Sequence, residues 1–115
     1  MSWSKFSVLF LVLLISGCSS AHTVRNEACP IRDRAQLKFV DMFDGTPEEL
    51  VILMPDVAYE TSGKWSLDYV YDAKRFVTVR CKYTDGESID VKISERIKSC
   101  NYKINTQRNL ALSCK

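Results

Sequence analysis

Apolar and polar side chains alternate along most of the second half of the chain. A period of two is typical of strands that bury one face. The pattern predicts strands over residues 64–72, 75–83 and 87–93, where the apolar side chains occupy odd positions. It resumes on even positions over residues 100–104 and 110–114. These five segments predict a mainly β domain.

A turn at residues 84–86 sets the pairing of two of these strands. A two-residue Asp85-Gly86 loop would put the two apolar faces on opposite sides of the sheet, which antiparallel pairing forbids. A three-residue loop of Thr84, Asp85 and Gly86, with Gly86 left-handed, removes the conflict. The predicted pairs are Tyr83 with Glu87, Cys81 with Ile89, Val79 with Val91 and Val77 with Ile93, and on the polar face Arg80 with Asp90 and Thr78 with Lys92.

The C-terminus predicts a second hairpin, whose turn lies at residues 106–108. This turn brings three pairs of even positions opposite one another. They are Ile104 with Leu110, Tyr102 with Leu112 and Cys100 with Cys114.

Most aromatic residues of these segments are expected in the core. Trp and Tyr also dominate many binding surfaces, but three of these residues share one alternating face with Leu67. The residues expected in the core are Trp65, Tyr69, Tyr71 and Tyr83, with the same expectation for Tyr59 and Tyr102.

The first half of the chain is less regular. Residues 36–43 predict a strand with Leu37 and Phe39 facing inward. The sequence Thr46-Pro47-Glu48-Glu49 is a helix-start signal, with a capping hydroxyl, a proline and two acids near the positive end of the helix dipole. Residues 50–54 then predict either one or two helical turns ended by Pro55 or a buried strand. The predicted fold is a small antiparallel sheet, a meander or a sandwich, of about five strands with one short helix or turn.

The N-terminus has the pattern of a bacterial secretion signal. The apolar run at residues 6–15 is shorter than the roughly 20 residues that span a bilayer, and it fits a signal peptide. The sequence Ile15-Ser16-Gly17-Cys18 resembles the lipobox of bacterial lipoproteins, in which the cysteine is acylated before cleavage. The resemblance implies a signal peptide over residues 1–17 and lipid on Cys18. The remaining length predicts a short tether over residues 18–27 and a single domain over residues 28–115.

The same resemblance implies a location. Ser19 is not the Asp that marks retention at the inner membrane, so we expect a lipid anchor at the periplasmic face of the outer membrane. The alternative is an ordinary signal peptide cleaved near Ala21, which would give a soluble periplasmic or secreted protein. Both interpretations take the domain out of the cytoplasm.

The chain has five cysteines, an odd number that the lipid site explains. With Cys18 acylated, four thiols remain in a small domain in an oxidising compartment, which predicts two disulfides and three possible pairings. The hairpin register favours Cys100 with Cys114, and Cys29 with Cys81, because a meander leaves Cys81 too far from Cys100 to bridge. No zinc site is predicted, since Cys-x-x-Cys pairs and clustered histidines are absent from the sequence.

Composition and residue types offer little catalytic chemistry. A net charge of +2, with 16 basic and 14 acidic residues, gives no basis for a nucleic-acid partner. The only histidine, His22, lies in the expected tether, whereas a hydrolase triad needs an imidazole held by the fold. The carboxylates of the first half are interpreted as solvated acids rather than an acid–base pair; they are Asp41, Asp44, Glu48, Glu49 and Asp56. We therefore predict no cofactor and no enzyme activity.

The spacing of the cysteines and their neighbours resembles a family of small, four-cysteine secreted proteins and lipoproteins of enterobacteria. The resemblance rests on three stretches: residues 28–30, which read Ala-Cys-Pro, residues 79–83 with Gly86, and residues 97–100 with Cys114. Trp65, Leu67, Asp68 and Tyr71 belong to it as well. The family is largely uncharacterised and some members are linked to type VI secretion, which implies an envelope role.

These observations lead to two expected functions. The first is a non-catalytic, lipid-anchored module that binds another protein in the envelope, such as an inhibitor or immunity protein. The alternative is a structural accessory lipoprotein of an envelope or secretion complex.

Overall fold

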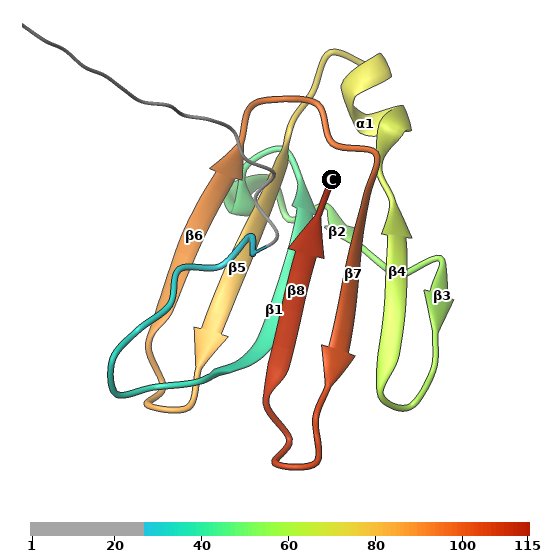
Figure 1. The fold of residues 1–115 in the computed structure, drawn as a ribbon. Coiled ribbons are helices and arrows are strands. Elements are labelled where there is room, and N and C mark those ends of the chain that lie inside the picture. The colour runs from blue at the N-terminus through green and yellow to red at the C-terminus, as the bar shows by residue number, and fades with distance from the viewer. Residues whose placement is uncertain (1–26) are drawn as a thin grey trace, which may run out of the picture.

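The computed structural model describes residues 27–115, and strands dominate this part of the chain. One antiparallel sheet has the order β2-β1-β5-β6 and the other has the order β3-β4-β7-β8 (Figure 1). The first sheet contains β1 (Leu37–Asp44), β2 (Ile52–Leu53), β5 (Val77–Tyr83) and β6 (Ser88–Ile93). The second contains β3 (Val57–Ala58), β4 (Ser62–Ser66), β7 (Ser99–Ile104) and β8 (Leu110–Cys114). The mainly β fold class is confirmed, as two four-stranded antiparallel sheets.

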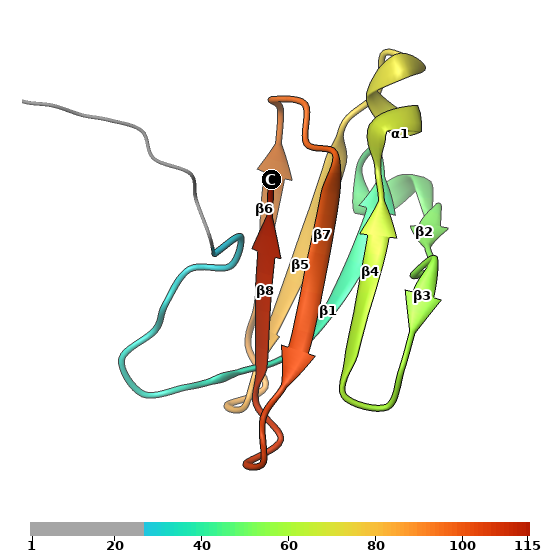
Figure 2. The ribbon, with the colours of Figure 1, turned by 45° about the vertical axis from the view of Figure 1, so that its right-hand side comes forward.

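The two sheets lie as layers over a shared core (Figure 2). Buried apolar side chains come from both, because each strand points alternate residues inward. The first sheet contributes Val40, Met42, Val77, Val79 and Cys81, and the second contributes Trp65, Cys100, Leu110 and Leu112.

The predicted β5–β6 hairpin is confirmed. Val77 pairs with Ile93, Val79 with Val91 and Cys81 with Ile89. The Tyr83 N–H donates to the Glu87 carbonyl oxygen at 2.9 Å, which closes the three-residue loop. Gly86 has a φ of +87°, and glycine adopts this left-handed conformation without a steric penalty.

The predicted β7–β8 hairpin is confirmed in the same way. Cys100 pairs with Cys114, Tyr102 with Leu112 and Ile104 with Leu110. Gly63 of β4 pairs with Tyr102 on the other side of β7, and a Cβ atom at Gly63 would lie 2.2 Å from the Tyr102 ring. Glycine at that position lets the ring lie against the neighbouring backbone.

The strand predicted over residues 64–72 is wrong in its second half. β4 ends at Ser66, and a short helix, α1, spans Asp68–Asp72. Leu67, Val70 and Tyr71 are buried, and their i, i+3, i+4 spacing is that of a helix face. Tyr69 is therefore exposed rather than in the core.

The first strand is placed correctly, and Leu37 packs against the core as predicted, but Phe39 does not. The register with β5 shifts between Leu37 and Phe39, so Lys38 forms a bulge. A bulge of one residue reverses the side-chain alternation beyond it. Val40 and Met42 are consequently buried, and Phe39 is 52% exposed.

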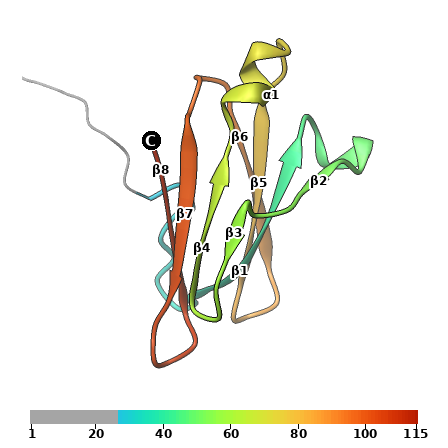
Figure 3. The same cartoon turned by 90° about the vertical axis from the view of Figure 1, so that its right-hand side faces the viewer.

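Residues 50–59 connect the two sheets, and we call them the connecting segment. Before them, η1 (Pro47–Glu49) is a single 3₁₀ turn that starts at the predicted signal. Neither further helical turns nor a buried strand follows. The segment instead forms β2 at the edge of the first sheet and β3 at the edge of the second (Figure 3).

Candidate functional site

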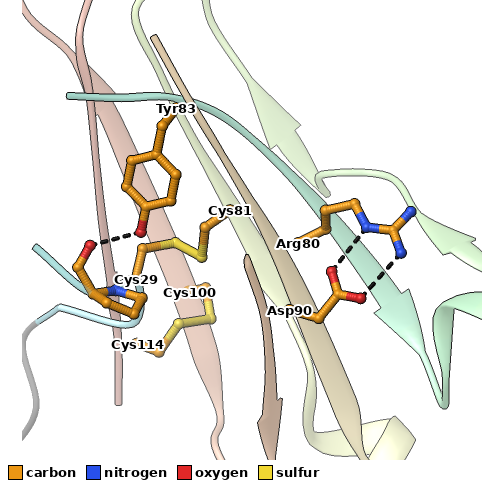
Figure 4. Close-up of a disulfide and its surroundings, with 8 residues drawn as sticks. Cys29, Arg80, Cys81, Tyr83, Asp90, Cys100 and Cys114 are labelled. Carbon is orange, nitrogen blue, oxygen red and sulfur yellow. Dashed lines mark hydrogen bonds and ion pairs between the residues drawn. A yellow bond between two sulfur atoms is a disulfide. The ribbon is translucent and has the colours of Figure 1, made fainter. Parts of the chain in front are cut away.

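Two disulfides hold the domain, and each joins the pair of cysteines that the register favoured (Figure 4). Cys29 precedes the sheets and bonds to Cys81 of β5, with their Cα atoms 5.9 Å apart. Cys100 and Cys114 link β7 to β8 across one hairpin. Two disulfides in a domain of this size indicate an oxidising, extracytoplasmic environment. Cys18 and His22 lie outside the described residues.

The chain around Cys29 is tied to both sheets. The Tyr83 hydroxyl donates to the Pro30 carbonyl oxygen at 2.6 Å (Figure 4), and the Ala28 N–H donates to the Leu112 carbonyl oxygen at 3.2 Å. Burial raises the pKa of Tyr83, and the nearby Arg32 partly counters this. These contacts give the segment a structural role in the fold.

The outward face of the β5–β6 hairpin carries both positive and negative side chains, which form ion pairs. Arg80 donates from Nε and Nη2 to the two oxygens of Asp90, at 2.8 and 3.0 Å. This pair of hydrogen bonds lowers the pKa of Asp90. Lys82 forms an ion pair with Asp41 at 2.8 Å. The predicted pair of Arg80 with Asp90 is therefore present, and this face carries charges of both signs.

Three of the first-half carboxylates take part in ion pairs. Arg75 contacts Asp44 and Glu49, each at 2.6 Å, and Asp41 contacts Lys82. A hydrogen bond from the Thr46 backbone N–H, followed by one from Arg75, lowers the pKa of Glu49. This arrangement keeps Glu49 ionised and fastens the start of the connecting segment.

Within residues 27–115, three or more His, Cys, Asp or Glu residues nowhere gather closely enough to hold a metal ion. The same part of the chain has no helix that is long and apolar enough to cross a membrane.

The connecting segment carries the main apolar surface of the described domain. Six of the nine large apolar residues that are exposed there lie within its ten positions. A globular domain rarely gathers exposed apolar side chains in this way unless they meet a partner. Tyr59 is 71% exposed, so the prediction that placed it in the core is wrong. The six are Leu50, Val51, Ile52, Met54, Val57 and Tyr59.

Leu50 stands out within this surface. Its backbone is left-handed, with φ 61° and ψ 28°, which costs an L-residue about 1–2 kcal/mol. Its side chain is 77% exposed, so packing in the domain offsets little of that cost. The left-handed backbone ends the 3₁₀ turn, where the Leu50 N–H donates to the Pro47 carbonyl oxygen at 3.0 Å. The turn thereby holds a large apolar side chain outward.

An apolar pocket of about 280 Å³ opens beside the connecting segment. Its lining includes Ile52, Leu53 and Met54 together with Phe39 and Trp65. Trp65 Nε1 donates to the Leu53 carbonyl oxygen at 2.9 Å, which fixes one wall of the pocket. The bulge in β1 that turns Phe39 outward thus contributes to the pocket.

Sequence reasoning missed this surface. The apolar run at residues 50–54 is predicted as helical turns or a buried strand, whereas most of its side chains are exposed and Leu53 is partly covered. Helix-start residues on one side and Pro55 on the other confine the run to a length too short for a core helix, and Pro55 has no N–H to donate to a sheet. These flanking residues were the sequence feature that could have indicated an exposed run.

No family model, curated protein or solved structure matches this chain. The resemblances to lipoproteins and to the four-cysteine family stay predictions.

Proposed function

We propose that this protein is a non-catalytic protein-binding module, held by lipid on Cys18 at the periplasmic face of the outer membrane. The supporting observation is the exposed apolar surface of the connecting segment. Binding surfaces derive most of their affinity from a few large side chains beside a pocket, and the connecting segment combines such side chains with the 280 Å³ pocket.

The disulfides support the extracytoplasmic part of the proposal. They hold Cys29 to β5 and β7 to β8, whereas neither is attached to the connecting segment. The scaffold is therefore covalently braced while the proposed binding surface stays open to a partner.

Mass spectrometry of the mature protein tests the anchor. We expect a chain that starts at Cys18 and carries acyl groups, with masses after non-reducing digestion that show two disulfides. A chain that starts near Ala21, without acyl groups, would instead indicate a soluble protein.

Site-specific photocrosslinking in cells that naturally make the protein tests the binding surface. A crosslinker at Ile52 is expected to give a discrete adduct with one protein, and the Met54→Ser substitution should weaken it. Ile31 is 82% exposed but lies outside the connecting segment, so a crosslinker there is the matched control. Equal adducts from the two positions, or none from Ile52, would contradict the proposal.

A further inference from the structure

The charged residues of the connecting segment and of its flanks along the chain are all acidic. The cations near them come from other parts of the chain: Arg75 pairs with Asp44 and Glu49, and Lys64 of β4 lies opposite Val57. Residues 44–60 contain five carboxylates and no Lys, Arg or His, although the whole chain has a net charge of +2. The five are Asp44, Glu48, Glu49, Asp56 and Glu60. Along the sequence, acids thus lie before and after the connecting segment, and Asp56 lies within it.

Three of these acids are available to a partner. Arg75 pairs with Asp44 and Glu49, but within the described residues Glu48, Asp56 and Glu60 form no ion pair. All three are exposed. Asp56 is held in place, because its Oδ2 accepts a hydrogen bond from the Ser66 backbone N–H at 2.5 Å.

The charges disfavour a second copy of this chain as the occupant. A symmetric dimer would bring the same surface of both copies together. Glu48, Asp56 and Glu60 of both copies would then lie in one interface, and like charges gathered there oppose association.

An added backbone strand is also disfavoured as the mode of binding. β2 and β3 are each two residues long, and Pro55 between them has no N–H to donate. Short edge strands and proline are features that block strand addition. Recognition by side chains is the mode that the connecting segment supports.

We infer that the connecting segment binds a basic partner protein, which inserts an apolar side chain into the pocket and places Lys or Arg side chains opposite Glu48, Asp56 and Glu60. This inference rests on the proposed function and specifies the chemistry of the partner. The pocket supplies apolar contact, while the acids give selectivity and speed association with a positive surface.

Selection from a displayed library of random twelve-residue peptides tests the inference with a defined probe. We expect the enriched peptides to carry Lys or Arg on both sides of a large apolar residue. Their affinity for the Glu48→Gln, Glu60→Gln variant should fall roughly threefold to tenfold, and added salt should weaken binding to the native protein. The matched control is Glu87→Gln, Glu95→Gln, which removes two exposed acids elsewhere and should leave the affinity unchanged.

The Ile52→Ser, Met54→Ser variant separates failure of the inference from failure of the proposed function. If the selected peptides lose affinity for this variant but carry no basic residues, the inference of a basic partner is wrong and the proposed binding module is still supported. Selection of no peptide that depends on these two residues would overturn both. Concentration-dependent dimers in sedimentation, lost in this variant, would identify a second copy as the occupant and overturn the inference.

Discussion

The β5–β6 hairpin and the connecting segment are both rich in aliphatic residues, yet they use them in opposite ways. β5 lies between β1 and β6, and its odd-numbered residues Val77, Val79 and Cys81 are fully buried. In the connecting segment, β2 and β3 each have a strand on one side only, and most of their apolar side chains face solvent.

The difference shows that neighbours, rather than hydrophobicity alone, decide burial. A central strand pairs with a strand on each edge and is covered on one face by the other sheet. Alternation of apolar and polar residues is then enough to place its apolar side chains in the core. The short edge strands β2 and β3, and the chain that passes between the two sheets, have no such cover. In this protein, the hairpins supply stability and the connecting segment supplies an accessible surface.

Removing the disulfides is expected to have the largest effect on the scaffold side of this comparison. The cysteines of one disulfide are 52 residues apart and those of the other are 14 apart. Because the larger loop restricts the unfolded chain more, Cys29→Ala with Cys81→Ala should lower the free energy of unfolding by about 4 kcal/mol, against about 3 kcal/mol for Cys100→Ala with Cys114→Ala. Urea unfolding of the two double variants measures both losses.

The order of the two losses is the informative result. A larger loss from the Cys100–Cys114 pair would show that the hairpin depends on its disulfide more than the N-terminal segment depends on Cys29. Hydrogen exchange of the connecting segment provides a control, since those of its amides that donate no hydrogen bond should exchange quickly in the native protein as well as in both variants.

Two leucines give a direct contrast between the regions. Leu112 of β8 is 2% exposed and Leu50 is 77% exposed. Leu112→Ala should lower the free energy of unfolding by about 3 kcal/mol, because it leaves a cavity in the core. Leu50→Gly should change it by less than about 1 kcal/mol, since relief of the left-handed backbone and the added freedom of glycine in the unfolded chain nearly cancel.

Urea unfolding measures the stability of these two variants, and peptide binding measures whether their surface still binds. Leu50→Gly is expected to fold normally and to lose affinity for the selected peptides. If it destabilised the domain as much as Leu112→Ala does, Leu50 would be a core residue and the contrast between the regions would fail.

The sequence predicted the hairpins well because their pattern and their register are local properties. The Thr84-Asp85-Gly86 loop determined the pairs of β5 with β6, and the turn at residues 106–108 determined those of β7 with β8. The second set placed Cys100 opposite Cys114, which left Cys29 for Cys81. The bulge at Lys38 and the helix over Asp68–Asp72 were missed, because each depends on packing against another part of the chain. The exposed surface was missed for the same reason: exposure reflects which neighbours are absent, and a run of apolar residues carries no record of them.

Lowering the pH is expected to give the smallest effect and to act on one carboxylate of the β5–β6 hairpin and on one that directly precedes the connecting segment. The pKa values of Glu49 and Asp90 are both lowered in the fold, from ordinary values of 4.5 and 3.8. A lowered pKa means that the ionised group stabilises the fold above its ordinary pKa and that this stabilisation is lost as the pH falls through the lowered value. The free energy of unfolding should therefore decline as the pH falls below about 4.5, with the contribution of Glu49 starting to decline at a higher pH than that of Asp90.

Two substitutions show which carboxylate causes each part of the fall in unfolding free energy at low pH. Glu49→Gln should flatten the first part of the curve of unfolding free energy against pH, because it removes the titrating group that holds the Thr46 N–H and Arg75. Asp90→Asn should flatten only the part at lower pH, where the pair with Arg80 breaks. Carboxyl NMR titrations of the native protein check the two pKa values directly. If neither substitution changed the slope, these exposed ion pairs would contribute nothing measurable, and the connecting segment would be held at its start by the 3₁₀ turn alone.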